Sequence, residues 1–152
     1  MKHSETGRSV DVKMTSADLL AERLDVARAE GLQIAMCHGV FDLLHPGHLR
    51  HLAHAKELAD VLVVSITADR FVNKGPGRPA FTEVLRAEAL GSLESVDFVI
   101  ITPDATALPA ISAIKPNFYV KGGDYLDEDM DVTGNIRRER ELVESFGGEL
   151  VH

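Results

Sequence analysis

The chain has 152 residues, which is enough for one domain with a hydrophobic core and short for two. Its 16 lysine and arginine residues against 24 aspartate and glutamate residues give a formal net charge of -8, which argues against nucleic acid or an anionic membrane as a general partner. An anionic ligand therefore needs a local cluster of donors. The single cysteine, Cys37, excludes an internal disulfide. Since the sequence shows no signal peptide and no bilayer-spanning apolar run, we expect a cytoplasmic protein.

The first half of the chain predicts a βαβ unit. Residues 1–14 are polar and lack periodicity, so we expect a flexible N-terminus. Apolar residues at helical spacing predict a helix over 17–30. The apolar run 33–38 predicts a short buried strand, Pro46 marks the start of a second helix, and 61–67 predicts a second strand. Strand, helix and strand in this order favour parallel pairing with a right-handed crossover.

The same alternation continues to the end of the chain. We predict a Gly/Pro loop over 73–80, a helix over 82–94, a strand over 97–101, a helix over 105–114, a strand over 117–122, a helix over about 133–146 and a final strand over 149–152. The predicted fold class is α/β, a doubly wound, Rossmann-like three-layer sandwich with a five-stranded parallel sheet. We expect residues 15–152 to form it as a single domain.

The stretch HGVFDLLHPGH, residues 38–48, falls in the first loop at the carboxyl edge of this sheet, where such folds bind ligands. His45, Gly47 and His48 surround the predicted helix start. Free backbone N–H groups and the positive end of the helix dipole favour an anion there, two imidazoles add donors, and a glycine lets a phosphate approach the backbone. The pattern predicts a site for phosphate groups.

These residues carry a resemblance. GVFDLLHPGH resembles the GxFDxxHxGH signature of the cytidylyltransferase-like nucleotidyltransferases, relatives of the HIGH-motif aminoacyl-tRNA synthetases. GRPAFTEVLRAEAL is similar to the family's second helix. KGGDY (121–125) resembles its fourth-strand loop, most closely in the branch that transfers AMP to a heptose 1-phosphate in making ADP-heptose.

The resemblance implies two sets of site residues. Those expected to bind the triphosphate and stabilise the transition state are His45, His48, Lys74 and Arg78. Those expected to line the nucleotide and acceptor side are Gly39, Val40, Phe41, Asp42, Gly47, Arg86, Lys121, Gly122, Gly123 and Asp124.

The implied reaction transfers a nucleotide, AMP from ATP, to a sugar phosphate such as a heptose 1-phosphate and releases pyrophosphate. CTP with glycerol 3-phosphate or a similar polyol phosphate is the alternative, and a non-catalytic nucleotide-binding module is another. We expect Mg²⁺ with the nucleotide, although no protein ligand for a metal stands out. The resemblance also suggests a homodimer and a covalent fusion to a C-terminal domain. Glu94 stands where glycerol-phosphate enzymes tend to carry an arginine, which favours ATP and a sugar phosphate.

The sequence departs from the family pattern at three places. His38 stands where relatives more often carry a small or amide residue, and VTGNIRRERELVES is longer than in typical heptose enzymes. The family's last helix, which bears a Ser/Thr-rich motif, has no counterpart before His152. We therefore expect that a C-terminal element completes the site, unless Arg137 or Arg138 closes it.

Several residues have a purely structural alternative. His45 and His48 could be a helix-capping and a surface histidine, and Lys74 and Arg78 could lie in a solvated loop. Arg86 could form a helix-surface ion pair with Glu83 or Glu88, and Asp124 could be a turn residue. We expect His51 and His54 to face solvent rather than bind zinc, and Cys37 to be a small core residue rather than a nucleophile.

Overall fold

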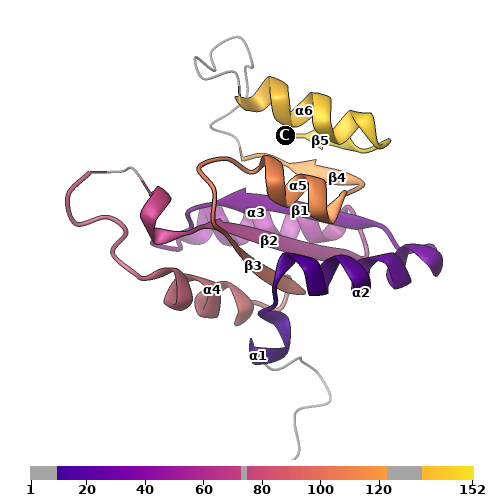
Figure 1. The fold of residues 1–152 in the computed structure, drawn as a ribbon. Coiled ribbons are helices and arrows are strands. Elements are labelled where there is room, and N and C mark those ends of the chain that lie inside the picture. The colour runs from indigo at the N-terminus through magenta and orange to yellow at the C-terminus, as the bar shows by residue number, and fades with distance from the viewer. Residues whose placement is uncertain (1–9, 73–74, 123–134) are drawn as a thin grey trace, which may run out of the picture.

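The computed structural model describes residues 10–72, 75–122 and 135–152. Five parallel strands form one sheet in the order β3-β2-β1-β4-β5 (Figure 1). The strands are β1 (Ile34–Gly39), β2 (Val61–Thr67), β3 (Phe98–Thr102), β4 (Phe118–Val120) and β5 (Glu149–Val151). The helices are α1 (Val10–Lys13), α2 (Ala17–Ala29), α3 (Pro46–Glu57), the short η1 (Asp69–Phe71), α4 (Glu83–Gly91), α5 (Leu108–Ile114) and α6 (Asn135–Ser145).

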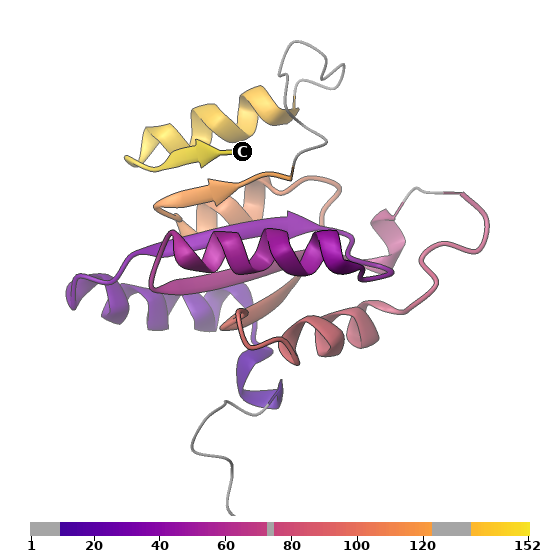
Figure 2. The ribbon, with the colours of Figure 1, turned by 180° about the vertical axis from the view of Figure 1, so that it is seen from behind.

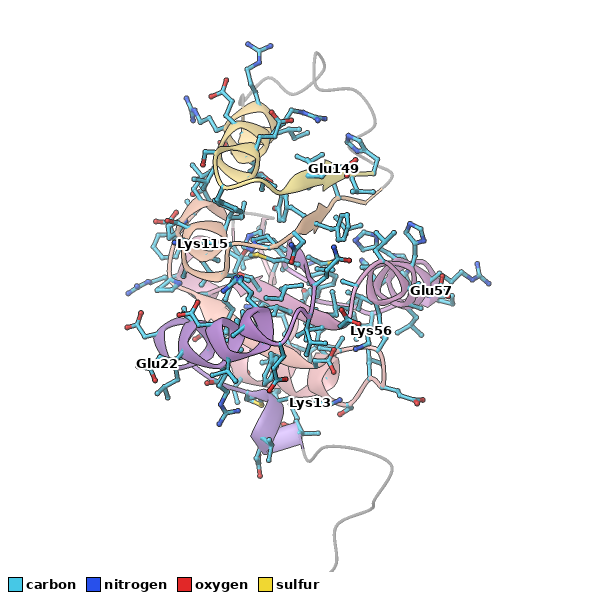
Figure 3. All side chains as sticks on the ribbon, turned by 90° about the vertical axis from the view of Figure 1, so that its right-hand side faces the viewer. Lys13, Glu22, Lys56, Glu57, Lys115 and Glu149 are labelled. Carbon is cyan, nitrogen blue, oxygen red and sulfur yellow. The ribbon has the colours of Figure 1, made fainter. Side chains whose placement is uncertain are left out.

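Helices cover both faces of the sheet, which confirms the predicted three-layer α/β fold. Alternate residues of β1 point to opposite faces. Ile34 and Met36 pack with α2, α5 and α6, whereas Ala35 and Cys37 pack with α3 and α4. Figure 2 shows α3 in front of the sheet when the molecule is seen from behind. Charged side chains such as Glu22 and Glu57 lie on the outward faces of the helices (Figure 3).

The predicted elements are confirmed, with boundaries that shift by at most three residues. The largest shift in a helix start has a clear cause. The helix predicted over 105–114 begins at Leu108, because Asp104 accepts hydrogen bonds from the backbone N–H and the hydroxyl of Thr106 at 2.8 and 2.9 Å. This turn holds the chain out of helical geometry for three residues. None of the described helices is long and apolar enough to cross a bilayer.

The expectation of a flexible segment through residue 14 is wrong for residues 10–14. Helix α1 packs against α4, and Lys13 is buried with its Nζ donating to the Leu93 carbonyl at 3.0 Å. Met14 forms a bridge with Val99 of β3. The segment is polar, but its lysine completes the hydrogen bonding at the end of α4 and covers apolar surface with its aliphatic stem. Residues 1–9 lie outside the described part of the chain.

The strand order indicates where on the carboxyl edge of the sheet a ligand can bind. The chain moves from β1 outward to β2 and β3, then crosses back to β4 and β5 on the other side of β1 (Figure 1). Loops that follow β1 and β4 therefore diverge at the carboxyl edge of the sheet. Open α/β sheets bind ligands at such a switch point, and the loop after β1 carries residues 40–45.

Candidate active site at the carboxyl edge of the sheet

His45 and His48 cap the start of α3 with their own imidazoles. His45 is the N-cap residue, and its Nδ1 accepts from the backbone N–H of Gly47 at 3.0 Å. The Nδ1 of His48 accepts from the backbone N–H of His45 at 3.3 Å. Since Nδ1 is the acceptor in both rings, the neutral imidazoles carry their proton on Nε2. The helix cap therefore uses Nδ1 of each ring, and the single N–H donor of each ring is on Nε2.

The other residues of the motif hold these rings in place. The ring of Phe41 meets His48 edge-on at 5.6 Å between centroids, and Phe41 is buried although its φ of 52° lies in the left-handed region. A Cβ on Gly39 would lie 3.0 Å from the Phe41 ring, and a Cβ on Gly47 would lie 2.7 Å from the His45 ring. The two glycines are therefore required by close approach to aromatic rings.

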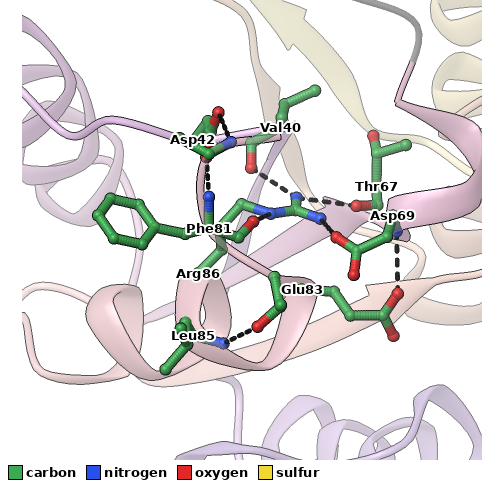
Figure 4. A network of polar contacts seen from close by, with 10 residues as sticks. Val40, Asp42, Thr67, Asp69, Phe81, Glu83, Leu85 and Arg86 are labelled. Atoms are coloured by element: carbon green, nitrogen blue, oxygen red, sulfur yellow. Dashed lines mark hydrogen bonds and ion pairs between the residues drawn. The ribbon is translucent and has the colours of Figure 1, made fainter. Parts of the chain in front are cut away.

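Asp42 anchors the loop that leads into α4. Its carboxylate accepts from the backbone N–H of Phe81 at 2.8 Å (Figure 4). It also accepts from the backbone N–H of Ala80 at 2.6 Å and from Nη1 of Arg78 at 3.0 Å. The Asp42 side chain is only 7% exposed. Burial acts to raise its pKa, but the hydrogen bonds from Ala80, Phe81 and Arg78 together lower the pKa below its usual value. Asp42 thus ties residues 78–81 to the loop after β1.

Arg86 lies beneath these loops, and its side chain is fully buried. Its Nη1 donates to the carbonyls of Val40 and Thr67, both at 2.9 Å, and its Nη2 pairs with Asp69 at 2.7 Å (Figure 4). Its Nε donates to the carbonyl of Phe81 at 3.0 Å. Arg86 therefore joins the ends of β1 and β2 to the start of α4.

The surface ion pair considered for Arg86 is wrong. Glu83 instead accepts from the backbone N–H of Asp69 at 2.9 Å, and Glu88 is exposed. Because three guanidinium nitrogens already donate to protein acceptors, the geometry favours a positioning role for Arg86 over the expected contact with the nucleotide.

On the β4 side of the edge, Lys121 is largely buried. Its Nζ pairs with Glu139 of α6 at 3.2 Å and lies 5.5 Å from the centre of the Tyr119 ring. Gly122 follows it with open space around its Cα. Glu139 belongs to the long IRRER segment, whose Arg137 and Arg138 are exposed. The structure therefore connects the KGG loop to α6 through a buried ion pair.

Three expected site residues, Lys74, Gly123 and Asp124, lie outside the described residues.

One polar residue at this edge was not among the expected site residues. His38, at the end of β1, has Nδ1 3.0 Å from the Ser65 hydroxyl and Nε2 3.4 Å from the Thr67 hydroxyl. Burial, and secondarily the charge of Lys121, lowers its pKa to about 4, with Asp104 acting weakly in the opposite direction. The ring is therefore neutral near pH 7. In the sequence, the departure from the family pattern at position 38 was the feature that could have drawn attention to this residue.

The remaining candidates are placed as follows. Cys37 is fully buried, and burial raises its pKa to about 12, which confirms a core thiol rather than a nucleophile. His54 is exposed as expected. His51 is half-buried, and burial followed by the charges of His54, His48 and Lys121 lowers its pKa. Within the described ranges no three His, Cys, Asp or Glu side chains come together to hold a metal ion.

Glu94 does not lie where the expected acceptor side of the site requires it. Glu94 is exposed and lies three residues before Asp97, which accepts from the Leu62 N–H where β2 begins. Glu94 is therefore at the amino edge of the sheet and cannot contact an acceptor at the carboxyl edge.

A hollow of about 420 Å³ is lined by Asp42, Phe81 and Leu85 among others, but neither imidazole of the motif lines it.

Comparisons with known proteins agree with this geometry. The cytidylyltransferase-like family model matches residues 36–148, from β1 to the end of the loop after α6. The chain belongs to the cytidylyltransferase-like family. The match includes the histidine pair, Asp42, Arg86 and Lys121.

Similar proteins include two named bifunctional protein HldE. The one from Pelobacter propionicus is 40% identical over 152 residues, 99% of this chain and 29% of that protein. The one from Nitrobacter hamburgensis is 45% identical over 138 residues, 90% of this chain and 27% of that protein. The chain thus spans less than a third of the length of these relatives.

Solved structures share the fold. A lipopolysaccharide core biosynthesis protein from Thermoplasma volcanium has a TM-score of 0.66 at 26% identity, covering 80% of this chain and 95% of that one. A pantoate-beta-alanine ligase from Francisella tularensis has a TM-score of 0.61 at 16% identity, covering 91% of this chain and 65% of that one. The second likeness shows the fold alone.

Proposed function

We propose that the chain is a nucleotidyltransferase that transfers AMP from ATP to a heptose 1-phosphate and releases pyrophosphate. The observation that carries the proposal is the pair of capping imidazoles at the start of α3, which place two ring N–H donors at the positive end of this helix. Similarity to proteins named bifunctional protein HldE supports it. Similarity to a lipopolysaccharide core biosynthesis protein supports a sugar phosphate as the acceptor.

The proposed chemistry is one direct displacement. A phosphate oxygen of the acceptor attacks the α-phosphorus of the nucleotide and forms a new P–O bond, while the bond from that phosphorus to the bridging oxygen breaks and pyrophosphate leaves. An anionic phosphate is already a nucleophile, so the protein supplies position and charge stabilisation. His45 and His48 donate to phosphate oxygens at the positive end of α3. The buried Cys37 takes no part.

Cationic side chains complete the neutralisation of the negative charge on the nucleotide phosphates. Arg78 is 42% exposed and pairs with Asp42. It can turn to a phosphate while Asp42 keeps its two backbone donors from Ala80 and Phe81. The resemblance assigns the same role to Lys74.

Mg²⁺ enters the proposal only as the counter-ion of the nucleotide. Both carboxylate oxygens of Asp42 accept hydrogen bonds, and the described residues offer no cluster of three metal-binding side chains. Magnesium commonly reaches such sites through substrate phosphates. We assign no catalytic step to it.

Cytidylyl transfer to glycerol 3-phosphate is the second candidate, because the family takes its name from that chemistry. One assay separates the candidates. Pyrophosphate release is measured with each of four NTPs against heptose 1-phosphate and glycerol 3-phosphate. We expect the highest kcat/KM with ATP and heptose 1-phosphate. A preference for CTP and glycerol 3-phosphate would replace the proposal, and no release with any pair would leave a nucleotide-binding module.

A further inference from the structure

A band of polar side chains crosses three strands at the carboxyl edge. On the face covered by α2 and α5, the inner positions of β1, β2 and β3 are the apolar Met36, Val63 and Ile100. Two residues later on each strand, where the side chain returns to the same face, stand His38, Ser65 and Thr102. The hydrophobic layer therefore ends abruptly where the ligand edge begins.

These side chains form one hydrogen-bonded chain. Thr102 bonds to Ser65, Ser65 bonds to Nδ1 of His38, and Nε2 of His38 faces the hydroxyl of Thr67. Ser65, Thr67 and Thr102 are 0, 7 and 3% exposed. The strands are already paired through their backbones, so the sheet needs none of these polar groups. Burying hydroxyls has a cost that aliphatic side chains at these positions would avoid.

His38 is the member of this band that a ligand can reach. It is partly exposed, whereas the three hydroxyl-bearing residues are buried beside it. Its Nε2 contact with Thr67, at 3.4 Å, is at the long end of the hydrogen-bond range, so a ligand hydroxyl can take its place. The backbone below is fixed, because Arg86 holds the carbonyl of Thr67.

The position of the band separates it from the nucleotide side. Arg78 and the histidine pair supply donors for phosphates, and Lys121 and Gly122 lie on the β4 side of β1. His38 reaches over β2, on the opposite side of β1. The two substrates of a transferase need separate subsites that meet at the reacting phosphorus.

We propose that His38, supported by Ser65, Thr67 and Thr102, recognises the hydroxyl groups of a polyhydroxylated acceptor phosphate. A neutral imidazole and neutral hydroxyls suit sugar hydroxyls, and the charged donors are left for the phosphate. This inference rests on the proposed function, since it assigns a subsite for the second substrate of that reaction.

The test compares His38→Gln and His38→Leu with a matched control, His54→Gln, on the exposed face of α3. We expect both His38 variants to raise the KM for heptose 1-phosphate about 3- to 10-fold, the loss of one hydrogen bond, with the KM for ATP changed less than about twofold. His54→Gln should change neither constant. An unchanged acceptor KM, or an equal rise in both constants, would overturn the inference.

A binding experiment keeps this test independent of turnover. Imidazole resonances of ¹⁵N-histidine-labelled protein are followed as heptose 1-phosphate is added without nucleotide, with inorganic phosphate as the comparison. We expect the His38 resonance to move with the sugar phosphate and not with inorganic phosphate. Binding of the sugar phosphate at His38 without pyrophosphate release would defeat the proposed function and support this inference. Pyrophosphate release together with a His38 resonance that does not shift would support the proposed function and contradict this inference.

Discussion

The imidazoles of His45 and His48 stack on one another, with ring centroids 3.8 Å apart and planes inclined by 29°. Each Nδ1 caps a backbone N–H, so stacking and capping together fix both rings at the start of α3. A donor that is already in place when charge develops on a phosphate needs no reorganisation during the reaction. Under the proposed function the pair combines this structural role with a catalytic one, and the two roles can be separated by mutation.

Replacing His48 by alanine should affect both roles unequally. We expect a decrease in kcat that corresponds to a loss of about 2.7 to 4 kcal/mol of transition-state stabilisation. The free energy of unfolding should fall by only about 1 kcal/mol, the usual contribution of a cap. Pyrophosphate release and urea unfolding measure the two effects, with His54→Ala as the control. A kcat near that of the unmodified protein would show that His48 is only a cap.

Arg86→Lys should be far from conservative. Lysine keeps the charge but cannot reach the carbonyls of Val40, Thr67 and Phe81 and the carboxylate of Asp69 at once. We expect the free energy of unfolding to fall by about 3 to 5 kcal/mol, as when a buried pair is broken. The exposed Arg23→Lys should change it by less than about 0.5 kcal/mol. Equal unfolding midpoints in urea for the two variants would contradict the role as a clamp.

Asp42→Asn should loosen the loop that leads into α4. The amide has one acceptor oxygen and no charge, so it cannot hold Ala80, Phe81 and Arg78 together. Phe81 is an exposed site for chymotrypsin, and we expect faster cleavage after it in this variant. Asp25→Asn, on the surface of α2, is the control. An unchanged cleavage rate would mean that residues 78–81 keep their conformation without the Asp42 carboxylate.

Stability should depend on pH through His38. Its pKa is about 4 in the folded chain and about 6.5 when unfolded, so the unfolded state binds more protons between these values. The free energy of unfolding is therefore highest above pH 6.5 and falls as the pH drops toward 4, by up to about 3 kcal/mol. Lys121 opposes the charged ring from β4, and Asp104 favours it from the loop after β3.

The measurement compares urea unfolding of the unmodified protein and His38→Gln at pH 7, 6 and 5. Glutamine does not titrate, so the stability difference between the two proteins should shrink or reverse as the pH falls. Asp42 is common to both proteins and cancels in this difference, whereas the titration of Asp104 is coupled to His38 and is part of the effect measured. Parallel curves across the range would show that His38 is not held neutral by the fold.

Local patterns were sufficient for the layout of the fold and for the position of the histidine pair at the start of α3. Helical and strand periodicities act over a few residues, and alternating elements leave few ways to build a parallel sheet. The histidine pair is equally local, since its capping bonds span two and three residues. For that reason HGVFDLLHPGH could be placed at a helix start from the sequence alone.

The partners of Arg86, Asp42 and His38 were decided only by the tertiary structure. Arg86 binds acceptors that are up to 46 residues away, and Asp42 binds donors 36 to 39 residues away. His38 contacts Ser65 because β1 and β2 pair in one particular register. Its neighbours are polar rather than apolar because it lies at the carboxyl end of β1. Strand order, register and burial are properties of the whole packed chain. They determine which polar groups lose water and find each other, and no short stretch of sequence carries that information.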